Sequence, residues 1–281
     1  MKDPALRRRL AESRAAPLVS LPTRVAAVAR HNGHQLASSA SWLVRSREHT
    51  NYTYDLEPLN LEHLAWFVAD LAGRDVADAR AALDEAANDR DLTEHLSRTV
   101  EQSERRGLMD RESRLGRRVG WYALVRLLRP EHVVETGTDK GLGSCVLAAA
   151  VLRNGQGRVT TLDINPAAGA MIAGKYADVV DLRIGDSLDA LAQLDAVDLF
   201  LHDSDHSAGH EARELAAITP RLTETALVLS DNAHVTWELP HWAEEHGRRF
   251  TFFAEQPKRH WYPGGGIGAA VHRRPGGNEG D

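Results

Sequence analysis

The sequence predicts an α/β protein in which a doubly wound, mostly parallel seven-stranded sheet follows an N-terminal helical extension. Two observations support this prediction. The first 125 or so residues contain no strand-like runs, whereas from about residue 130 short β-branched runs alternate with alanine-rich helical stretches. Such alternation is typical of a parallel sheet with helices on both faces. We therefore expect a helical extension over 1–125, an α/β domain over 126–273 and a disordered tail over 274–281.

The composition excludes several classes of protein. At 281 residues and a net charge of −6, the chain lacks the basic surplus of a general nucleic-acid binder. No apolar run approaches the ~20 residues of a membrane span, and the N-terminus lacks the apolar core of a secretory signal. The single cysteine, Cys145, excludes an internal disulfide and favours a packed core thiol. We expect a cytoplasmic protein without nucleic-acid or membrane partners.

The helices of the extension are predicted from the spacing of its apolar residues and from its composition. The stretch 55–73 ends at Gly73, and its apolar residues recur at helical intervals. Its expected buried face holds Leu61, Leu64, Ala65 and Val68. The segment 75–107 is alanine-rich and heavily charged, as expected of exposed helices.

Seven runs in the second part of the chain are predicted as strands. They are 132–136, 158–164, 180–184, 197–202, 226–230, 248–254 and 267–271. Helices are expected between the first five runs, as at 144–155 and 210–222. Ligands of such sheets bind beyond the carboxyl ends of the strands. The residues that follow each run are therefore the candidates for a site.

A glycine-rich turn follows the first run. It reads ETGTDKG from Glu135 to Gly141 and leads into a helix. Glycines let the backbone approach a ligand closely, and a helix N-terminus favours negative charge. The dinucleotide pattern G-x-G-x-x-G and the P-loop pattern are both absent. Taken alone, this turn fits a structural role as well as a ligand-binding one.

Acidic residues follow the next strands. Asp163 comes twenty residues after Gly143, where a carboxylate can accept two ribose hydroxyls. Asp186 and Ser187 follow the third run and are placed to bind an adenine edge. Each acid taken singly is commonly a helix cap or a turn residue. Their occurrence at successive strand ends favours a ligand site.

The ordered series ETGTDKG, LDIN, GDS and FLHDSDH resembles the motifs of class I S-adenosylmethionine-dependent methyltransferases over roughly residues 115–272. The resemblance implies a Rossmann-like fold and S-adenosylmethionine as cofactor of the domain 126–273. The glycine turn matches the E-x-G-T-x-x-G variant of small-molecule O-methyltransferases. The cofactor-binding residues that the resemblance implies are Glu135, Gly137, Thr138, Gly141, Asp163, Ile164, Asp186, Ser187 and Asp203.

A metal site is also predicted. Asp203 follows the fourth run, and Asp231 and Asn232 follow the fifth, so the three side chains are expected to converge at one rim of the sheet. Three oxygen ligands suit Mg²⁺. The trio resembles the metal ligands of catechol and caffeoyl-CoA O-methyltransferases. A metal-free relative, with SDN forming a turn, is the alternative.

His206 stands where those families carry a lysine that acts as general base. Imidazole has an ordinary pKa near ~6.5 and accepts a proton at neutral pH. We expect His206 and Asp203 to be the catalytic residues. A hydrogen-bonded structural role is the alternative for His206. His202, His210 and His234 lie nearby and are other candidates for the base.

The expected activity is methyl transfer from S-adenosylmethionine to a hydroxyl of a small molecule, assisted by Mg²⁺. Three alternatives are a metal-independent N-, O- or C-methyltransferase, a nicotinamide-linked oxidoreductase and a non-catalytic relative. The resemblance implies that the N-terminal helices form a lid or a homodimer surface. Arg117 or Arg118 could reach the cofactor carboxylate. Candidates for the substrate pocket are Tyr52, Tyr54, Trp121 and Trp237.

Overall fold

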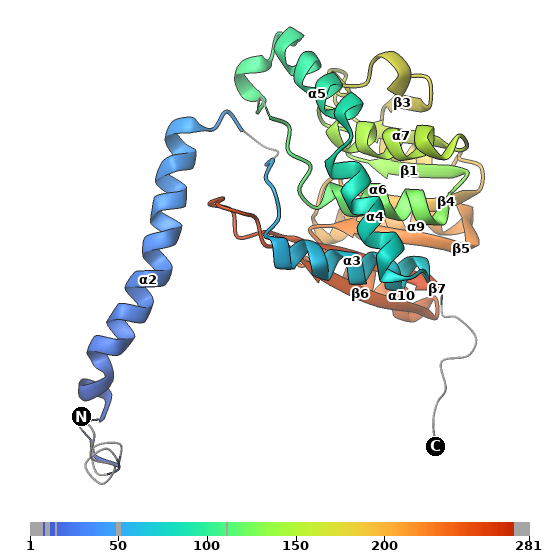
Figure 1. Ribbon diagram of the computed structural model, residues 1–281. Helices are drawn as coiled ribbons and strands as arrows, with labels where there is room; N and C mark the ends of the chain where they lie inside the picture. Colours follow the sequence, from blue (N-terminus) through green and yellow to red (C-terminus); the bar gives the residue numbers. More distant parts are fainter. Residues whose placement is uncertain (1–7, 9–11, 15, 49–51, 111, 273–281) are drawn as a thin grey trace. The chain divides into compact units, whose positions relative to one another are not determined.

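The computed structural model describes residues 8, 12–14, 16–48, 52–110 and 112–272 (Figure 1). The chain divides into two units. The smaller comprises the residues up to Ser46 with Arg259–Tyr262, and the larger comprises the rest. The predicted tail 274–281 lies outside the described residues.

The larger unit is built on a seven-stranded sheet with the order β3-β2-β1-β4-β5-β7-β6. The strands are β1 (His132–Thr136), β2 (Arg158–Asp163), β3 (Val180–Ile184), β4 (Val197–His202), β5 (Leu222–Asp231), β6 (Arg248–Ala254) and β7 (Gly266–His272). Strand β7 pairs antiparallel with β5 and β6, and all other pairs are parallel. The predicted fold class is confirmed, and the order reverses between β1 and β4, which places a ligand crevice there.

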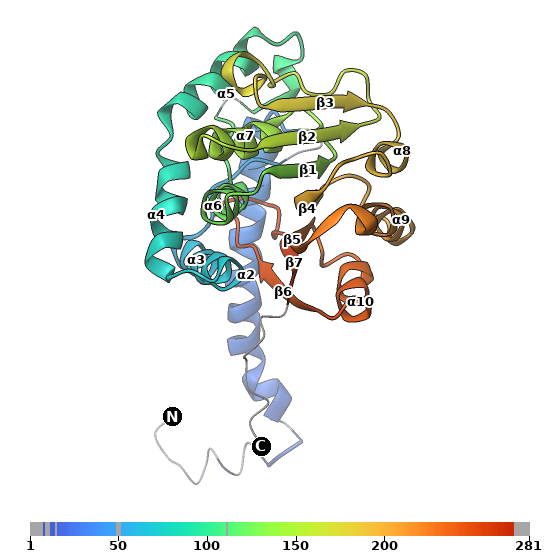
Figure 2. The ribbon, with the colours of Figure 1, turned by 90° about the vertical axis from the view of Figure 1, so that its right-hand side faces the viewer.

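Two groups of helices flank the sheet, and Figure 2 shows them on its opposite sides. One group holds α3 (Pro58–Ala72), α4 (Val76–Ala87), α5 (Arg90–Gln102), α6 (Arg118–Leu128) and α7 (Leu142–Asn154). The other holds α8 (Ser187–Leu191), α9 (Ala208–Ile218) and α10 (Glu238–Glu245). The central strands are covered on both faces, which is why β1 is buried throughout and reads as a continuous run.

The helical extension forms as expected, with one correction. Helix α3 ends at Gly73, whose left-handed φ of 61° suits a residue without a Cβ. Leu64 and Val68 are buried, but Leu61 is 36% exposed and lies at the edge of the packed face. Leu64 packs on Gly120 of α6, where an added Cβ would lie 2.8 Å from the Leu64 side chain. Helix α3 therefore belongs to the core of the larger unit.

The expected helices between the first five strands are only partly present. Between β2 and β3 the chain forms a short 3₁₀ helix, Gly174–Tyr176, and no α-helix. Helix α9 ends at Ile218, because the 3₁₀ turn Thr219–Arg221 leads directly into β5. Strand β5 therefore begins earlier than predicted. The larger unit also contains a 3₁₀ helix, Arg106–Leu108, and an isolated antiparallel β-bridge between Leu56 and Pro257.

The smaller unit is dominated by α2 (Ala16–Arg45), a helix of 30 residues. None of its residues is buried. Trp42 packs against Trp261, with ring centroids 5.0 Å apart. No helix of the described residues has both the length and the apolarity needed to cross a membrane.

Candidate functional site

A cleft of about 460 Å³ lies at the carboxyl ends of the central strands. Six of the predicted site residues line it, namely Gly137, Asp163, Ile164, Asp186, Ser187 and Asp203. Ser204, Asp205 and His210 line it as well. These predicted residues therefore meet in one cleft at the strand ends, where ligands of such sheets bind.

Gly137 brings two loops of the cleft into backbone contact. Its φ is 91°, and its N–H donates to the Leu162 carbonyl at 2.8 Å. A Cβ added here would lie 2.0 Å from the Asp203 carbonyl oxygen. The turn after β1 can approach the turn after β4 only because residue 137 has no side chain.

Asp163 orders the cleft from the end of β2. Its two carboxylate oxygens accept the N–H groups of Asp139 and Asn165, each at 2.8 Å. The side chain is only half-buried, and each oxygen has a further lone pair for a ligand. The neighbouring Ile164 is 76% exposed and gives the cleft an apolar wall.

Asp186 and Ser187 begin α8 at the opposite wall. Asp186 caps the helix by accepting the Leu188 N–H at 2.9 Å. The hydroxyl of Ser187 donates to Glu214 at 2.5 Å. Both residues therefore have structural partners in addition to their place in the cleft.

Three predicted cofactor residues belong to the glycine turn but do not line the cleft. Glu135 is buried, and its carboxylate accepts the hydroxyls of Ser144 and Thr161. Burial raises the pKa of Glu135 to about 7, although these hydrogen bonds oppose the shift. Thr138 shares a 2.7 Å hydrogen bond with Thr161, and Gly141 begins α7. These residues support the turn from its inner side.

Asp203, His206 and Asp231 converge at the rim of the sheet. The convergence of Asp203 and Asp231, the two predicted carboxylate ligands, was expected. Their ligand atoms all lie within 4.8 Å of one another. Nε2 of His206 is 3.9 Å from Oδ1 of Asp203 and 3.1 Å from Nδ2 of Asn232. Asn232 has a left-handed φ of 53°, which turns the chain sharply after β5. His206 therefore lies within the cluster of the two carboxylates and contacts the third predicted ligand, Asn232.

A buried arginine, Arg117, shares this cluster. Its guanidinium donates to both carboxylate oxygens of Asp231 and, at 3.1 Å, to the hydroxyl of Tyr54. Glu255 accepts the Tyr54 hydroxyl at 2.6 Å and lies 3.6 Å from Arg117. Arg117 thus makes a bidentate contact with a carboxylate of the protein, and Tyr54 is buried in the core.

The other three aromatic candidates for the substrate pocket differ in burial. Trp121 is fully buried and belongs to the core, whereas Trp237 is largely exposed. Tyr52 is half-buried. None of the four aromatic candidates lines the cleft.

The two carboxylates and the imidazole of the cluster differ in how far neighbouring charges offset the effect of burial on their pKa values. Burial, together with the charge of Asp231, raises the pKa of the Asp203 carboxyl well above its ordinary value. Burial also acts on Asp231, but the charge and hydrogen bonds of Arg117 outweigh it and lower the pKa of Asp231. Burial lowers the pKa of His206, against the opposing charge of Asp231. His206 is therefore neutral at pH 7 and can accept a proton.

Glu214 of α9 holds the loops of the site together. Its buried carboxylate accepts hydrogen bonds from five side chains on four segments. The donors are Thr136 at 2.6 Å, Ser187 at 2.5 Å, His202 at 2.7 Å, Ser204 at 3.0 Å and His210 at 2.9 Å. Glu214 was not among the residues predicted from the sequence. The one indication of its role is that an acid occupies a position on the buried face of α9, which Leu215 and Ile218 mark by their helical spacing.

Glu211, one turn earlier on α9, anchors the end of β5. It accepts the hydroxyl of Ser230 at 2.7 Å and that of Thr236. Two buried acids on one helix thus fix the loops that carry Asp203 and Asp231. His202 and His210, two of the other candidates for the base, each form a hydrogen bond with Glu214.

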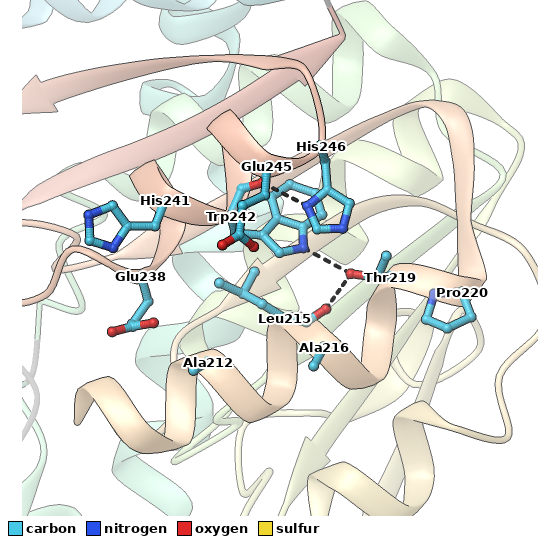
Figure 3. A pocket seen from close by; sticks show the side chains of 10 residues that line it. All are labelled: Ala212, Leu215, Ala216, Thr219, Pro220, Glu238, His241, Trp242, Glu245 and His246. Carbon is cyan, nitrogen blue, oxygen red and sulfur yellow. Dashed lines mark hydrogen bonds between the residues drawn. The ribbon is translucent and has the colours of Figure 1, made fainter.

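A second hollow of about 450 Å³ lies between α9 and α10 (Figure 3). Leu215 and Trp242 form its floor, and the indole N–H of Trp242 donates to Thr219 at 2.9 Å. No predicted site residue lines this hollow. It marks the packing seam of the two helices.

Comparison with known proteins agrees with this description. Residues 134–233 match the family described as a methyltransferase domain. That segment runs from β1 to the turn after β5 and contains the whole cleft. The predicted resemblance is thereby confirmed for residues 134–233, which are similar to a methyltransferase domain.

Several solved structures are similar to the chain. A methyltransferase from Geobacter sulfurreducens is 22% identical, with a TM-score of 0.48 over 64% of this chain and 90% of that one. An O-methyltransferase from Bacillus cereus in complex with SAH is 17% identical, with a TM-score of 0.43 over 74% and 97%. A SAH-bound methyltransferase from Podospora anserina is 15% identical, with a TM-score of 0.46 over 80% and 100%. The comparison with curated proteins finds no match.

Proposed function

We propose that the protein transfers the methyl group of S-adenosylmethionine to a hydroxyl of a small molecule. The observation that carries the proposal is the position of the Asp203, His206 and Asp231 cluster at the rim of the strand-end cleft, which Asp203 also lines. A cofactor in the cleft would therefore lie next to a neutral imidazole and two carboxylates. That set of groups suits the deprotonation of a hydroxyl.

The cleft supplies contacts for each part of the cofactor's nucleoside. The free lone pairs of Asp163 suit two ribose hydroxyls, and exposed Ile164 suits the face of the adenine. Asp186 is exposed at the opposite wall, where its carboxylate can accept the adenine amino group. Bound S-adenosylmethionine supplies the methyl group as a sulfonium.

An Asp163→Ala variant tests the cofactor site. We expect its affinity for S-adenosylhomocysteine to fall by about tenfold to a hundredfold, because two charge-assisted hydrogen bonds are lost. Isothermal titration measures this change. Asp195→Ala, which removes a carboxylate that is 90% exposed, is the matched control. Unchanged affinity in Asp163→Ala would place the cofactor elsewhere.

His206 is the proposed general base. Neutral His206 takes the proton of the substrate hydroxyl, and the oxygen forms a bond to the methyl carbon as the carbon–sulfur bond breaks. The products are a methyl ether, S-adenosylhomocysteine and one proton, which His206 passes to solvent. The chain's further task is to hold the oxygen in line with the methyl group.

The cluster also suits a divalent cation. Two buried carboxylates, those of Asp231 and Glu255, pair with the guanidinium of Arg117, and the mostly buried carboxylate of Asp203 belongs to the same cluster as Asp231. We infer that Asp203 and Asp231, with Asn232, hold Mg²⁺, which offsets the remaining negative charge. A cation there supplies positive charge that favours the deprotonated hydroxyl.

Arg117 supports a second candidate, metal-independent transfer. It already engages both carboxylate oxygens of Asp231 and brings a permanent positive charge to the cluster. In that case the guanidinium would take over the electrostatic role of the cation. Chelation separates the two candidates. Loss of activity in EDTA with recovery in Mg²⁺ supports the first, and full activity in EDTA supports the second.

A His206→Gln variant tests the base. We expect kcat to fall by about 10²–10⁴-fold, the usual contribution of a general base, while affinity for S-adenosylhomocysteine stays unchanged. The assay follows formation of S-adenosylhomocysteine with a panel of phenols and other hydroxyl compounds. His234→Gln removes the exposed alternative histidine and serves as control. If only His234→Gln lost activity, the assignment of the base would be wrong.

A further inference from the structure

An aromatic ring lines the strand-end cleft at a position that no strand-end motif contains. Of the described residues that line the cleft, His210 alone carries such a ring. It lies in the first turn of α9, beyond the motif FLHDSDH. It also lies outside the cluster of Asp203, His206 and Asp231. The ring is therefore part of the cleft but not of the groups proposed to remove the proton.

The two nitrogens of this imidazole are bound within the protein. Nε2 of His210 donates to Oε1 of Glu214 at 2.9 Å, one helical turn further along α9. Because a carboxylate only accepts, this contact places a proton on Nε2. Nδ1 accepts from Arg213 at 3.5 Å. The side chain is still 19% exposed. With both nitrogens engaged, the ring can meet a ligand in the cleft through its π face.

Glu214 also fixes the surroundings of the ring. The same oxygen, Oε1, accepts the hydroxyls of Ser187 at 2.5 Å and of Ser204 at 3.0 Å, and both serines line the cleft. One fully buried acid thus places three lining side chains, from the start of α8, the loop after β4 and α9. A ring that is held in this way loses little conformational freedom when a ligand stacks on it, which favours affinity.

Ile164 gives the cleft a second surface for a flat ring. It follows β2, is 76% exposed and lines the same cleft as His210. A nucleobase has two π faces, and side chains that stack on them bind any base. Asp186, which also lines the cleft, can accept the amino group of adenine in the plane of the ring. The lining residues therefore provide for both faces of an adenine and for one of its edges.

We propose that the adenine of the cofactor stacks on the imidazole of His210, with Ile164 at its other face. The inference rests on the proposed function, because it adds one binding residue to the cofactor site. The competing role for His210 is structural, in which its hydrogen bond to Glu214 only anchors the first turn of α9. The two roles use different parts of the side chain, since stacking needs the ring and anchoring needs the donor.

Two substitutions separate these roles. His210→Phe keeps a ring and loses the donor to Glu214, whereas His210→Gln keeps a donor near the position of Nε2 and loses the ring. We expect His210→Phe to bind S-adenosylhomocysteine as tightly as the wild type, and His210→Gln to bind it about tenfold to a hundredfold more weakly. The melting temperature should show the reverse order, because only His210→Phe removes a hydrogen bond from the buried carboxylate.

Isothermal titration measures the affinity, and thermal unfolding measures the melting temperature. His241→Gln alters an exposed histidine of α10 that does not line the cleft, and is expected to change neither quantity. Nuclear magnetic resonance detects the stack directly. The imidazole proton signals of His210, assigned by their absence from His210→Gln, should move upfield when S-adenosylhomocysteine is added, because they enter the shielding region of the adenine ring.

Two results would overturn the stacking while leaving the cofactor site intact. One is a His210→Gln variant that binds S-adenosylhomocysteine as tightly as the wild type. The other is a loss of affinity that follows the loss of melting temperature in both variants, which would show that His210 only anchors α9. A wild type that does not bind S-adenosylhomocysteine would overturn the proposed function and this inference together.

Discussion

A Glu214→Ala variant is expected to lose about 3–5 kcal/mol of unfolding free energy, the cost of removing one partner from a buried charged network. Five side chains donate to this carboxylate, and three of them, Thr136, Ser187 and His202, end β1, begin α8 and end β4. Without the carboxylate these donors are buried without an acceptor. The loop that carries Asp203 and His206 then loses its anchor, so activity falls as well.

Urea unfolding at neutral pH measures this loss. Glu224→Ala removes an exposed glutamate from β5 and is the matched control, with an expected change within about 0.5 kcal/mol. Glu214→Gln keeps the shape of the side chain and should fall between the two. A Glu214→Ala variant as stable as the control would contradict the role assigned to the network.

The same carboxylate predicts a pH dependence. The His202 hydrogen bond and charge, followed by the hydroxyl donors, outweigh burial and lower the pKa of Glu214 to about 2. A lowered folded-state pKa stabilises the protein above the unfolded pKa of ~4.3, and this stability is lost as the pH falls toward 2. The difference between wild type and Glu214→Ala should therefore shrink in acid.

A Gly137→Ala variant is expected to abolish cofactor binding and to cost about 3 kcal/mol or more. The added Cβ would lie 2.0 Å from the Asp203 carbonyl oxygen, which belongs to the backbone and cannot move alone. The positive φ of 91° adds strain for any residue with a side chain. Because the turns after β1 and β4 would separate, the wall of the cleft would open.

Gly155→Ala provides a matched control for this strain. Gly155 has a φ of 68° at the end of α7, and a Cβ added there meets no atom within 4 Å. We expect this variant to lose about 1 kcal/mol and to bind S-adenosylhomocysteine normally. Calorimetric titration and urea unfolding compare the two. If both variants lost the same unfolding free energy and the same affinity, backbone strain alone, and not the contact with Asp203, would explain why residue 137 is glycine.

The strands and the cleft were predictable because local patterns encode them. The β-branched runs fall on the seven strands of the sheet, and the acids Asp163, Asp186 and Asp203 lie at the carboxyl ends of β2, β3 and β4, which belong to the parallel half of that sheet. A parallel sheet brings such residues to one rim whatever the details of packing. Leu61 was misplaced because the periodicity of α3 locates a face but not its edge.

The partners of the charged groups were not predictable from local patterns. Arg117 and Asp231 pair across 114 positions of the chain, and nothing near either residue signals the other. The hydrogen bonds of Glu135 to Ser144 and Thr161 likewise join residues 9 and 26 positions away and could not be predicted from ETGTDKG itself. Glu214 was missed because a buried acid contradicts the usual hydrophobic pattern of a helix.

The amino-acid sequence by itself determined the order of strands and helices, the glycine turn and the rim on which the acids gather. These depend on hydrophobic period and turn chemistry, which act over a few residues. The tertiary structure alone decided which carboxylate is neutralised by Arg117, which histidines are bound by Glu214, and that His206 has an imidazole nitrogen close to Asp203. Charges and hydrogen bonds depend on distance in space, and that distance exists only once the sheet has formed.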